Sequence, residues 1–220
     1  MPFSPFVLLA LLFLLGLLLM FIQLGVLTIS FAKLGLSADS ALLLLLVSLM
    51  GSVINLPMFT VSAEEPPAGS VPPRLFRLLK QHMPPFEGKT TVAINAGGGL
   101  VPVSFSLYLI YYNPLPLADL LLAIAIVSAV SYFASRPVPG VGIGMPFLLA
   151  PLLAALVALL LNPQQSAPLA YICGTLGVLI GADLLRIKDI RKMGTPIAAI
   201  GGAGTFDGVF ITGIIAALLA

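Results

Sequence analysis

Long apolar runs, separated by short polar or basic segments, occupy most of this chain. A helix needs about 20 apolar residues to cross about 30 Å of hydrocarbon, so each run is long enough to span a membrane. The runs lie at roughly Phe6–Ile29, Ala41–Val61, Thr91–Tyr111, Pro116–Ala134, Val141–Leu161, Ala167–Leu185 and Thr195–Leu219. The pattern predicts an all-α fold, a polytopic transmembrane helix bundle of about seven spans that forms a single domain over residues 1–220.

The basic residues are distributed unevenly among the predicted loops. Nine of the ten lie in the loops that follow the second, fourth and sixth spans, and only Lys33 lies in an odd-numbered loop. Cytoplasmic loops carry the excess of Lys and Arg in membrane proteins. We therefore expect a multi-pass protein of the cell (inner) membrane, with a cytoplasmic N-terminus and an external C-terminus.

The longest predicted cytoplasmic loop covers residues 62–88. It opens with prolines and acids, and from Leu75 its apolar residues recur at i, i+3, i+4 and i+8 with cations on the remaining face. This pattern is typical of a short amphipathic helix that lies in the membrane interface. We interpret the segment as a loop anchored flat on the membrane, and binding of a lipid or a partner protein is the alternative.

Composition supports a membrane protein. Hydrophobic residues make up 60% of the chain and charged residues 8%, whereas a soluble domain carries about 25% charged residues. The lipid bilayer is the first expected partner, and a net charge of +2 spread over short loops indicates no nucleic-acid partner. One cysteine and one histidine exclude an internal disulfide and a Cys- or His-rich metal site, so we expect no metal and no cofactor. The oligomeric state stays open.

Helix-breaking residues interrupt several of the predicted spans. Such breaks are tolerated at membrane depth only where neighbouring helices or a polar cavity satisfy the freed backbone groups. One interpretation is a surface that contacts a substrate, and the other is close packing of helices through small residues. The residues singled out at these breaks are Asn55, Asn95, Gly97, Gly98, Gly201, Gly202 and Gly204. The prolines and glycines of the 139–146 segment form another break.

Two aspartates stand out because an ionisable group within a span costs at least about 2.5–3.5 kcal/mol at the helix centre. Asp183 lies near the cytoplasmic end of the sixth predicted span and, taken alone, is expected to pair with Arg186 or Lys188. Asp207 follows the glycines of the seventh span, and a helix that begins near Thr205 would place it in the first turn, level with Asp183. Two carboxylates that meet in a low dielectric form a general acid and base around a water molecule.

This arrangement resembles the GxGD-type intramembrane aspartyl proteases, the presenilin and signal-peptide-peptidase group. In that family an aspartate on a sixth span faces a second aspartate in a glycine-rich motif that opens the seventh, and here Gly204 stands three residues before Asp207. The resemblance implies that Asp183 and Asp207 are catalytic and that a transmembrane peptide is the substrate.

Over its full length the chain resembles an uncharacterised family of small polytopic membrane proteins from bacteria and archaea. That resemblance implies no activity, and the segments that carry it are Phe31–Leu36, Ser48–Ser52, Asn95–Gly98 and Gly194–Gly208.

Three functions follow as competing hypotheses. The first is a membrane-embedded aspartyl hydrolase that uses the Asp183 and Asp207 pair. The second is a small ion- or proton-coupled transporter, in which broken helices at the membrane midplane bind a small solute and Asp207 binds a proton or cation. The third is a non-catalytic membrane scaffold in which the aspartates pair with neighbouring groups.

Overall fold

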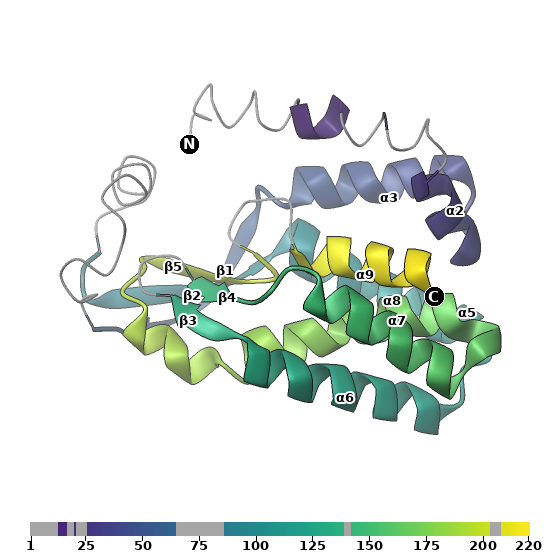
Figure 1. The fold of residues 1–220 in the computed structure, drawn as a ribbon. Coiled ribbons are helices and arrows are strands. Elements are labelled where there is room, and N and C mark those ends of the chain that lie inside the picture. The colour runs from purple at the N-terminus through teal and green to yellow at the C-terminus, as the bar shows by residue number, and fades with distance from the viewer. Residues whose placement is uncertain (1–12, 17–19, 21–25, 65–85, 139–141, 203–207) are drawn as a thin grey trace.

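The computed structural model describes residues 13–16, 20, 26–64, 86–138, 142–202 and 208–220. Figure 1 shows helices lying side by side over most of the molecule and small β-sheets gathered at one end. The α-helices are α2 (Val26–Lys33), α3 (Ala38–Gly51), α5 (Val101–Tyr112), α6 (Leu117–Ala134), α7 (Leu149–Leu161), α8 (Ser166–Val178) and α9 (Gly208–Leu219). Short helical segments of other types are the π-helical turns Ala96–Leu100 and Leu179–Leu184 and the 3-10 turns Pro163–Gln165 and Ile187–Lys192.

Five strands form two sheets among the described residues. The larger sheet has the order β1 (Asn55–Ser62), β2 (Lys89–Asn95) and β5 (Ile197–Ile200), with β1 antiparallel and β5 parallel to β2. The pairing of β1 with β2 is irregular between Pro57 and Phe59. The smaller sheet is an antiparallel hairpin of β3 (Arg136–Val138) and β4 (Gly142–Gly144).

The prediction of an all-α bundle of about seven spans is therefore wrong. Among the described residues only two helices are long and apolar enough to cross a membrane, Leu117–Ala134 and the continuous helical stretch Pro163–Leu184. They coincide with the fourth and sixth predicted spans, and by length and composition they weakly suggest membrane association. The first predicted span and the proposed amphipathic helix of the 62–88 loop fall largely outside the described residues.

The error has a physical cause in four of the apolar runs. A hydropathy average does not separate one long helix from a strand joined to a shorter helix, and β-branched residues such as Thr91, Val92 and Ile94 favour the strand. The second, third and seventh predicted spans accordingly contain β1, β2 and β5. In the fifth predicted span, strand β4 precedes α7, which has only 13 residues.

Helix α8 is the centre of the helical part. Its side chains are nearly all buried, and it packs against α5, α6, α7 and α9. Glycines make the approach to α6 close, because a Cβ at Gly177 would lie 2.7 Å from the Cβ of Val127, and one at Gly181 would collide with the carbonyl oxygen of Ser128. Gly177 and Gly181 are four residues apart and share one face of the helix, which is the spacing that lets two helix backbones pack tightly.

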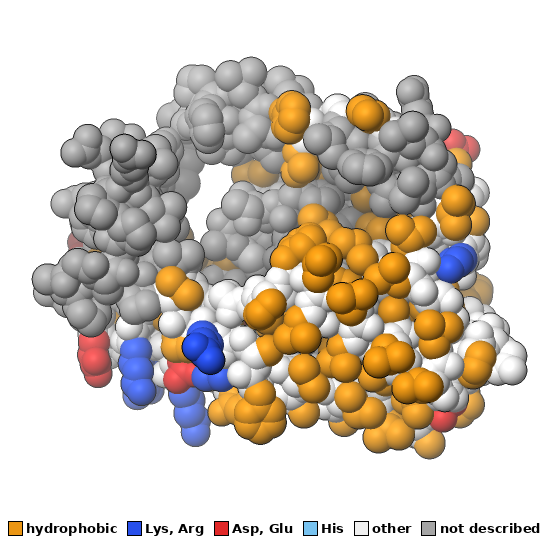
Figure 2. All heavy atoms as spheres, in the orientation of Figure 1, with side chains coloured by type: hydrophobic (Ala, Val, Ile, Leu, Met, Phe, Trp, Pro, Cys, Tyr) orange, Lys and Arg blue, Asp and Glu red, His pale blue; other side chains and the backbone are white. Residues whose placement is uncertain are grey.

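Large apolar side chains also cover the outside of the helices. Figure 2 shows them as a broad apolar surface over this face of the molecule, with most of the visible basic side chains near one end of it. They project from α3, α5, α6 and α7, and include Leu43, Met50, Leu107, Tyr111, Leu121, Phe133, Leu152, Leu156 and Leu160. Exposed apolar surface on this scale marks contact with a membrane or another protein.

Candidate binding cavity

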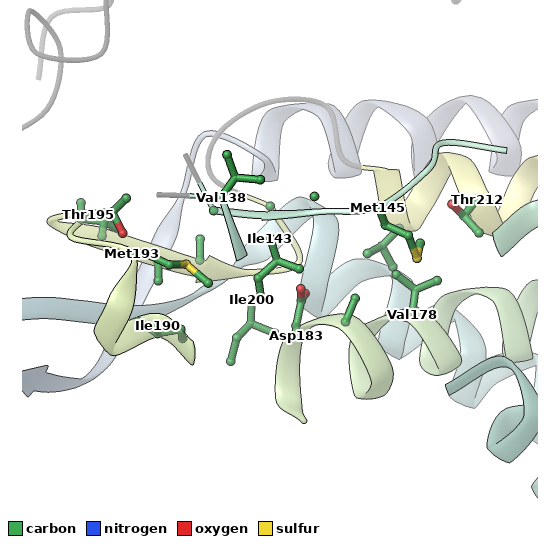
Figure 3. Close-up of a pocket in the computed structure, with 18 of the residues that line it drawn as sticks. Val138, Ile143, Met145, Val178, Asp183, Ile190, Met193, Thr195, Ile200 and Thr212 are labelled. Atoms are coloured by element: carbon green, nitrogen blue, oxygen red, sulfur yellow. The ribbon is translucent and has the colours of Figure 1, made fainter. Parts of the chain in front are cut away.

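A cavity of about 360 Å³ lies where the sheets meet the helices. Its walls come from the β3–β4 hairpin, the end of α8, strand β5 and the first turns of α9 (Figure 3). Most of the lining is apolar, and the hairpin residue Ile143 lies over Ile200 of β5 in Figure 3. The remaining large apolar lining residues are Val138, Met145, Phe147, Val178, Ile190, Met193, Ile197 and Val209.

Asp183 is the only ionisable side chain among the described residues that line this cavity. It stands in the π-helical turn that continues α8, and it is half-buried. The backbone N–H of Gly201 donates a hydrogen bond of 2.8 Å to its Oδ2 atom. No other hydrogen bond to the carboxylate is formed within the described part of the chain, so a ligand that enters the cavity can approach the second oxygen.

Two threonines add hydroxyl groups to the lining. Thr195 is 3% exposed, and its Oγ1 has no hydrogen-bond partner among the described residues. Its carbonyl oxygen accepts a hydrogen bond of 2.6 Å from the Thr90 hydroxyl, which fixes the backbone where β5 begins. Thr212 reaches the cavity from α9 and is also buried. Burial of the Thr195 hydroxyl without a partner carries a free-energy cost, which a ligand that accepts or donates a hydrogen bond at this end of the cavity would reduce.

The asparagines that the sequence singles out lie together, away from this cavity lining. Asn95 Nδ2 donates to Asn55 Oδ1 at 2.9 Å and to the Ser52 carbonyl at 2.7 Å, while Asn95 Oδ1 accepts from the Gly98 N–H at 2.8 Å. Both amide hydrogens and the oxygen of Asn95 are therefore engaged. The side chain caps the π-helical turn Ala96–Leu100 and ties it to the end of α3.

The glycines at the predicted breaks allow backbones to approach. A Cβ on Gly97 would collide with the backbone of α3 at Ser48 and Ser52, and the Ser48 hydroxyl donates to the Gly97 carbonyl at 2.7 Å. Gly98 is buried in the same turn, against Gly201, whose φ is +78°. These contacts are those of the close-packing interpretation, and of the glycines in this set that the structure describes, only Gly202 lines the cavity.

The structure does not describe every predicted site residue. Gly204 and Asp207 lie outside the described residues, so the expected meeting of Asp183 with Asp207 stays a prediction. The expected partner of Asp183 differs, since Arg186 donates from Nη1 to Asp189 Oδ2 at 3.0 Å instead. Among the described residues no group of three or more His, Cys, Asp or Glu side chains is placed to hold a metal ion.

Sequence reasoning missed Thr195 as part of a site. It treated the prolines and glycines of the 139–146 segment as a helix break that could contact a substrate, and the described residues Gly142–Gly144 form strand β4 and one wall of the cavity instead. The lining comes from described residues within 138–147 and within 178–212, two stretches that meet only in the folded protein.

Comparison with known proteins gives a family without an assigned activity. A family model described as "Protein of unknown function (DUF1614)" matches residues 49–219. No curated protein and no solved structure matches the chain. None of these comparisons supports the resemblance to the GxGD-type proteases.

Proposed function

Because the chain belongs to DUF1614, a family that implies no activity, we propose from the geometry alone that it is a membrane-embedded solute-binding protein of the carrier type. The solute is a small, largely apolar cation that occupies the cavity beside Asp183. One observation carries the proposal: a half-buried carboxylate faces an apolar cavity in which no described residue supplies a positive charge.

Charge complementarity selects the solute. A carboxylate withdrawn from water is stabilised by an opposite charge or by a hydrogen-bond donor. Gly201 supplies one N–H to Oδ2, and a cationic ligand would supply the rest at the second oxygen. A cavity of about 360 Å³ is within the range that small-molecule sites occupy. Its apolar walls suit a ligand whose charge is surrounded by carbon.

The exposed apolar side chains and the two long helices support embedding in a membrane. Helix α6 has 18 residues, and at about 1.5 Å per residue it is about 27 Å long, close to the thickness of the hydrocarbon core. Both long helices end at the sheet end, where most described cations lie. By the positive-inside rule, the excess of basic residues supports a cytoplasmic position for this end.

The hydrolase hypothesis needs a second carboxylate beside Asp183. Its candidate, Asp207, lies outside the described residues, whereas the apolar lining around Asp183 by itself supports binding of a solute.

The test is binding of benzyltrimethylammonium, an apolar cation, to the purified full chain in detergent, measured by calorimetry. We expect Asp183→Asn to weaken binding at least tenfold, or about 1.4 kcal/mol. Asparagine keeps an oxygen that accepts from Gly201, so this change removes the charge and spares the contact. The matched control is Asp119→Asn, another half-buried carboxylate, which accepts a hydrogen bond from Asn162 at 3.1 Å near the start of α6.

Two further results would decide the matter. Phenylacetate, an apolar anion of similar size, should not bind to the native protein. Equal affinity of native and Asp183→Asn protein for the cation, or no binding by the native protein, would overturn the proposal.

A further inference from the structure

Five exposed cations at the sheet end form a surface that we name the basic collar: Lys89, Arg136, Lys188, Arg191 and Lys192. We propose that the basic collar docks on the headgroups of anionic phospholipids. The inference rests on the membrane embedding proposed above and is independent of the solute in the cavity.

The fold gathers these cations from distant parts of the chain. Arg136 follows the end of α6, whereas Lys188, Arg191 and Lys192 belong to the 3-10 turn that follows α8. Strand β3 and this 3-10 turn are in contact. Lys89 begins β2 and is paired with Ser62, and the chain just beyond Ser62 is held to the Arg191 carbonyl by the N–H of Glu64 at 2.8 Å.

Arg186 holds the two helix ends together. Its Nη2 atom donates to the carbonyl oxygens of Tyr132 at 2.7 Å and Ser135 at 2.9 Å, and its guanidinium lies 4.4 Å from the centre of the Tyr132 ring. The side chain therefore satisfies carbonyl groups that the end of α6 leaves open. These contacts explain why Arg136 and the 3-10 turn lie side by side. Because the Arg186 side chain is occupied by them, we do not count it in the basic collar.

The acidic groups near the basic collar do not neutralise it. Asp189 is engaged by Arg186, and Glu64 and Glu87 are the other described acids along these segments. No salt bridge joins any cation of the basic collar to an acid within the described part of the chain. The five cations therefore leave a net positive surface.

The apolar surface beside the basic collar favours a membrane over a soluble partner. Phe133 is 78% exposed one turn before Arg136, and Leu184 and Leu185 are exposed just before the 3-10 turn. Figure 2 shows most of the basic side chains of this face together at one edge of the broad apolar surface. Aromatic and basic side chains at the edge of an apolar band are typical of the boundary between hydrocarbon and headgroups.

Lipid selectivity tests the proposal. The full chain is reconstituted in phosphatidylcholine vesicles that carry a trace of spin-labelled phosphatidylglycerol or spin-labelled phosphatidylcholine, and the motionally restricted fraction of each label is measured. Each Lys or Arg near an anionic surface strengthens the attraction up to about fivefold. We expect native protein to prefer phosphatidylglycerol, and the neutral triple variant K188Q/R191Q/K192Q to lose most of that preference.

The control keeps the charge. The variant K188R/R191K/K192R should retain the preference, and high salt should weaken it because these cations are exposed. Binding of benzyltrimethylammonium by the neutral variant reports that the cavity is intact. If no protein binds that cation but the lipid preference follows the basic collar, the proposed function fails and this inference stands.

Three results would overturn the inference. They are equal restriction of the two lipids by native protein, an unchanged preference in the neutral variant, and loss of the preference in the charge-preserving variant. Displacement of the labelled lipid by inorganic phosphate at low millimolar concentration would also overturn it, because it would indicate a site for free anions.

Discussion

Replacing Gly201 by alanine should unfold the junction between the sheet and the cavity. Gly201 has a φ of +78°, and its N–H donates to Asp183. A Cβ at this position would lie 2.6 Å from the backbone nitrogen of Gly99 and 2.7 Å from the carbonyl carbon of Gly98. Both neighbours are backbone atoms in a buried turn, so no side chain can rotate away.

The magnitude follows from four contributions. An alanine in the left-handed region costs about 1–2 kcal/mol, and the loss of unfolded-state freedom offsets about 0.4–1 kcal/mol of this. Overpacking against backbone adds about 1–3 kcal/mol. Displacing the N–H from the Asp183 carboxylate adds up to about 1.5–3 kcal/mol. We expect a total destabilisation of about 3–7 kcal/mol, which is a large fraction of the stability of a typical domain.

Gly35 provides a matched control. Its φ is +76°, and a Cβ there would meet nothing within 4 Å. Gly35→Ala therefore carries the backbone strain without the collision, and we expect a cost of about 1 kcal/mol.

The measurement is the free energy of unfolding of the full chain in detergent, obtained by denaturant titration and followed by circular dichroism. The Gly201 variant should unfold at a clearly lower denaturant concentration than the Gly35 variant. Equal destabilisation of the two would refute the reasoning, because it would mean that the backbone contact with Gly98 and Gly99 does not limit the space at Gly201.

Two further comparisons use the same titration. Gly97→Ala should lower the free energy of unfolding by at least about 2 kcal/mol, since its Cβ would collide with the backbone at Ser48. Gly99→Ala in the same turn should lower it by about 1 kcal/mol, since the atom nearest to its Cβ is a side-chain atom at 3.0 Å. Similar values for both would contradict the conclusion that Gly97 is needed for close backbone packing. Arg186→Lys should cost about 2 kcal/mol because a lysine cannot reach both carbonyls at the end of α6 and the carboxylate together. The control Asp189→Asn removes only the partly exposed ion pair and should cost less than about 1 kcal/mol. A larger loss would show that the ion pair, and not the contacts of Arg186 with the carbonyls, holds the 3-10 turn to the end of α6.

Features that depend on local composition could be predicted from the sequence. The apolar runs at 116–134 and 167–185 identified α6 and α8, because each is apolar over the length that a long helix needs. It also identified Asn95, Gly97 and Gly201 as unusual, since small or amide residues inside apolar runs mark places where the backbone needs space or a partner. The family membership agrees with the expected uncharacterised family.

The fold was needed to show which apolar runs contain strands and which partner each polar group has. Strands β2 and β5 pair with each other although about one hundred residues separate them in the sequence, and a local sequence pattern does not indicate such a pairing. For the same reason the sequence predicted Arg186 as the partner of Asp183. In the fold, Asp183 accepts a hydrogen bond from the Gly201 N–H, and Arg186 donates to carbonyl groups at the end of α6. The cavity is a further case, because its walls combine described residues within 138–147 with described residues within 178–212, and only the fold brings these two stretches together.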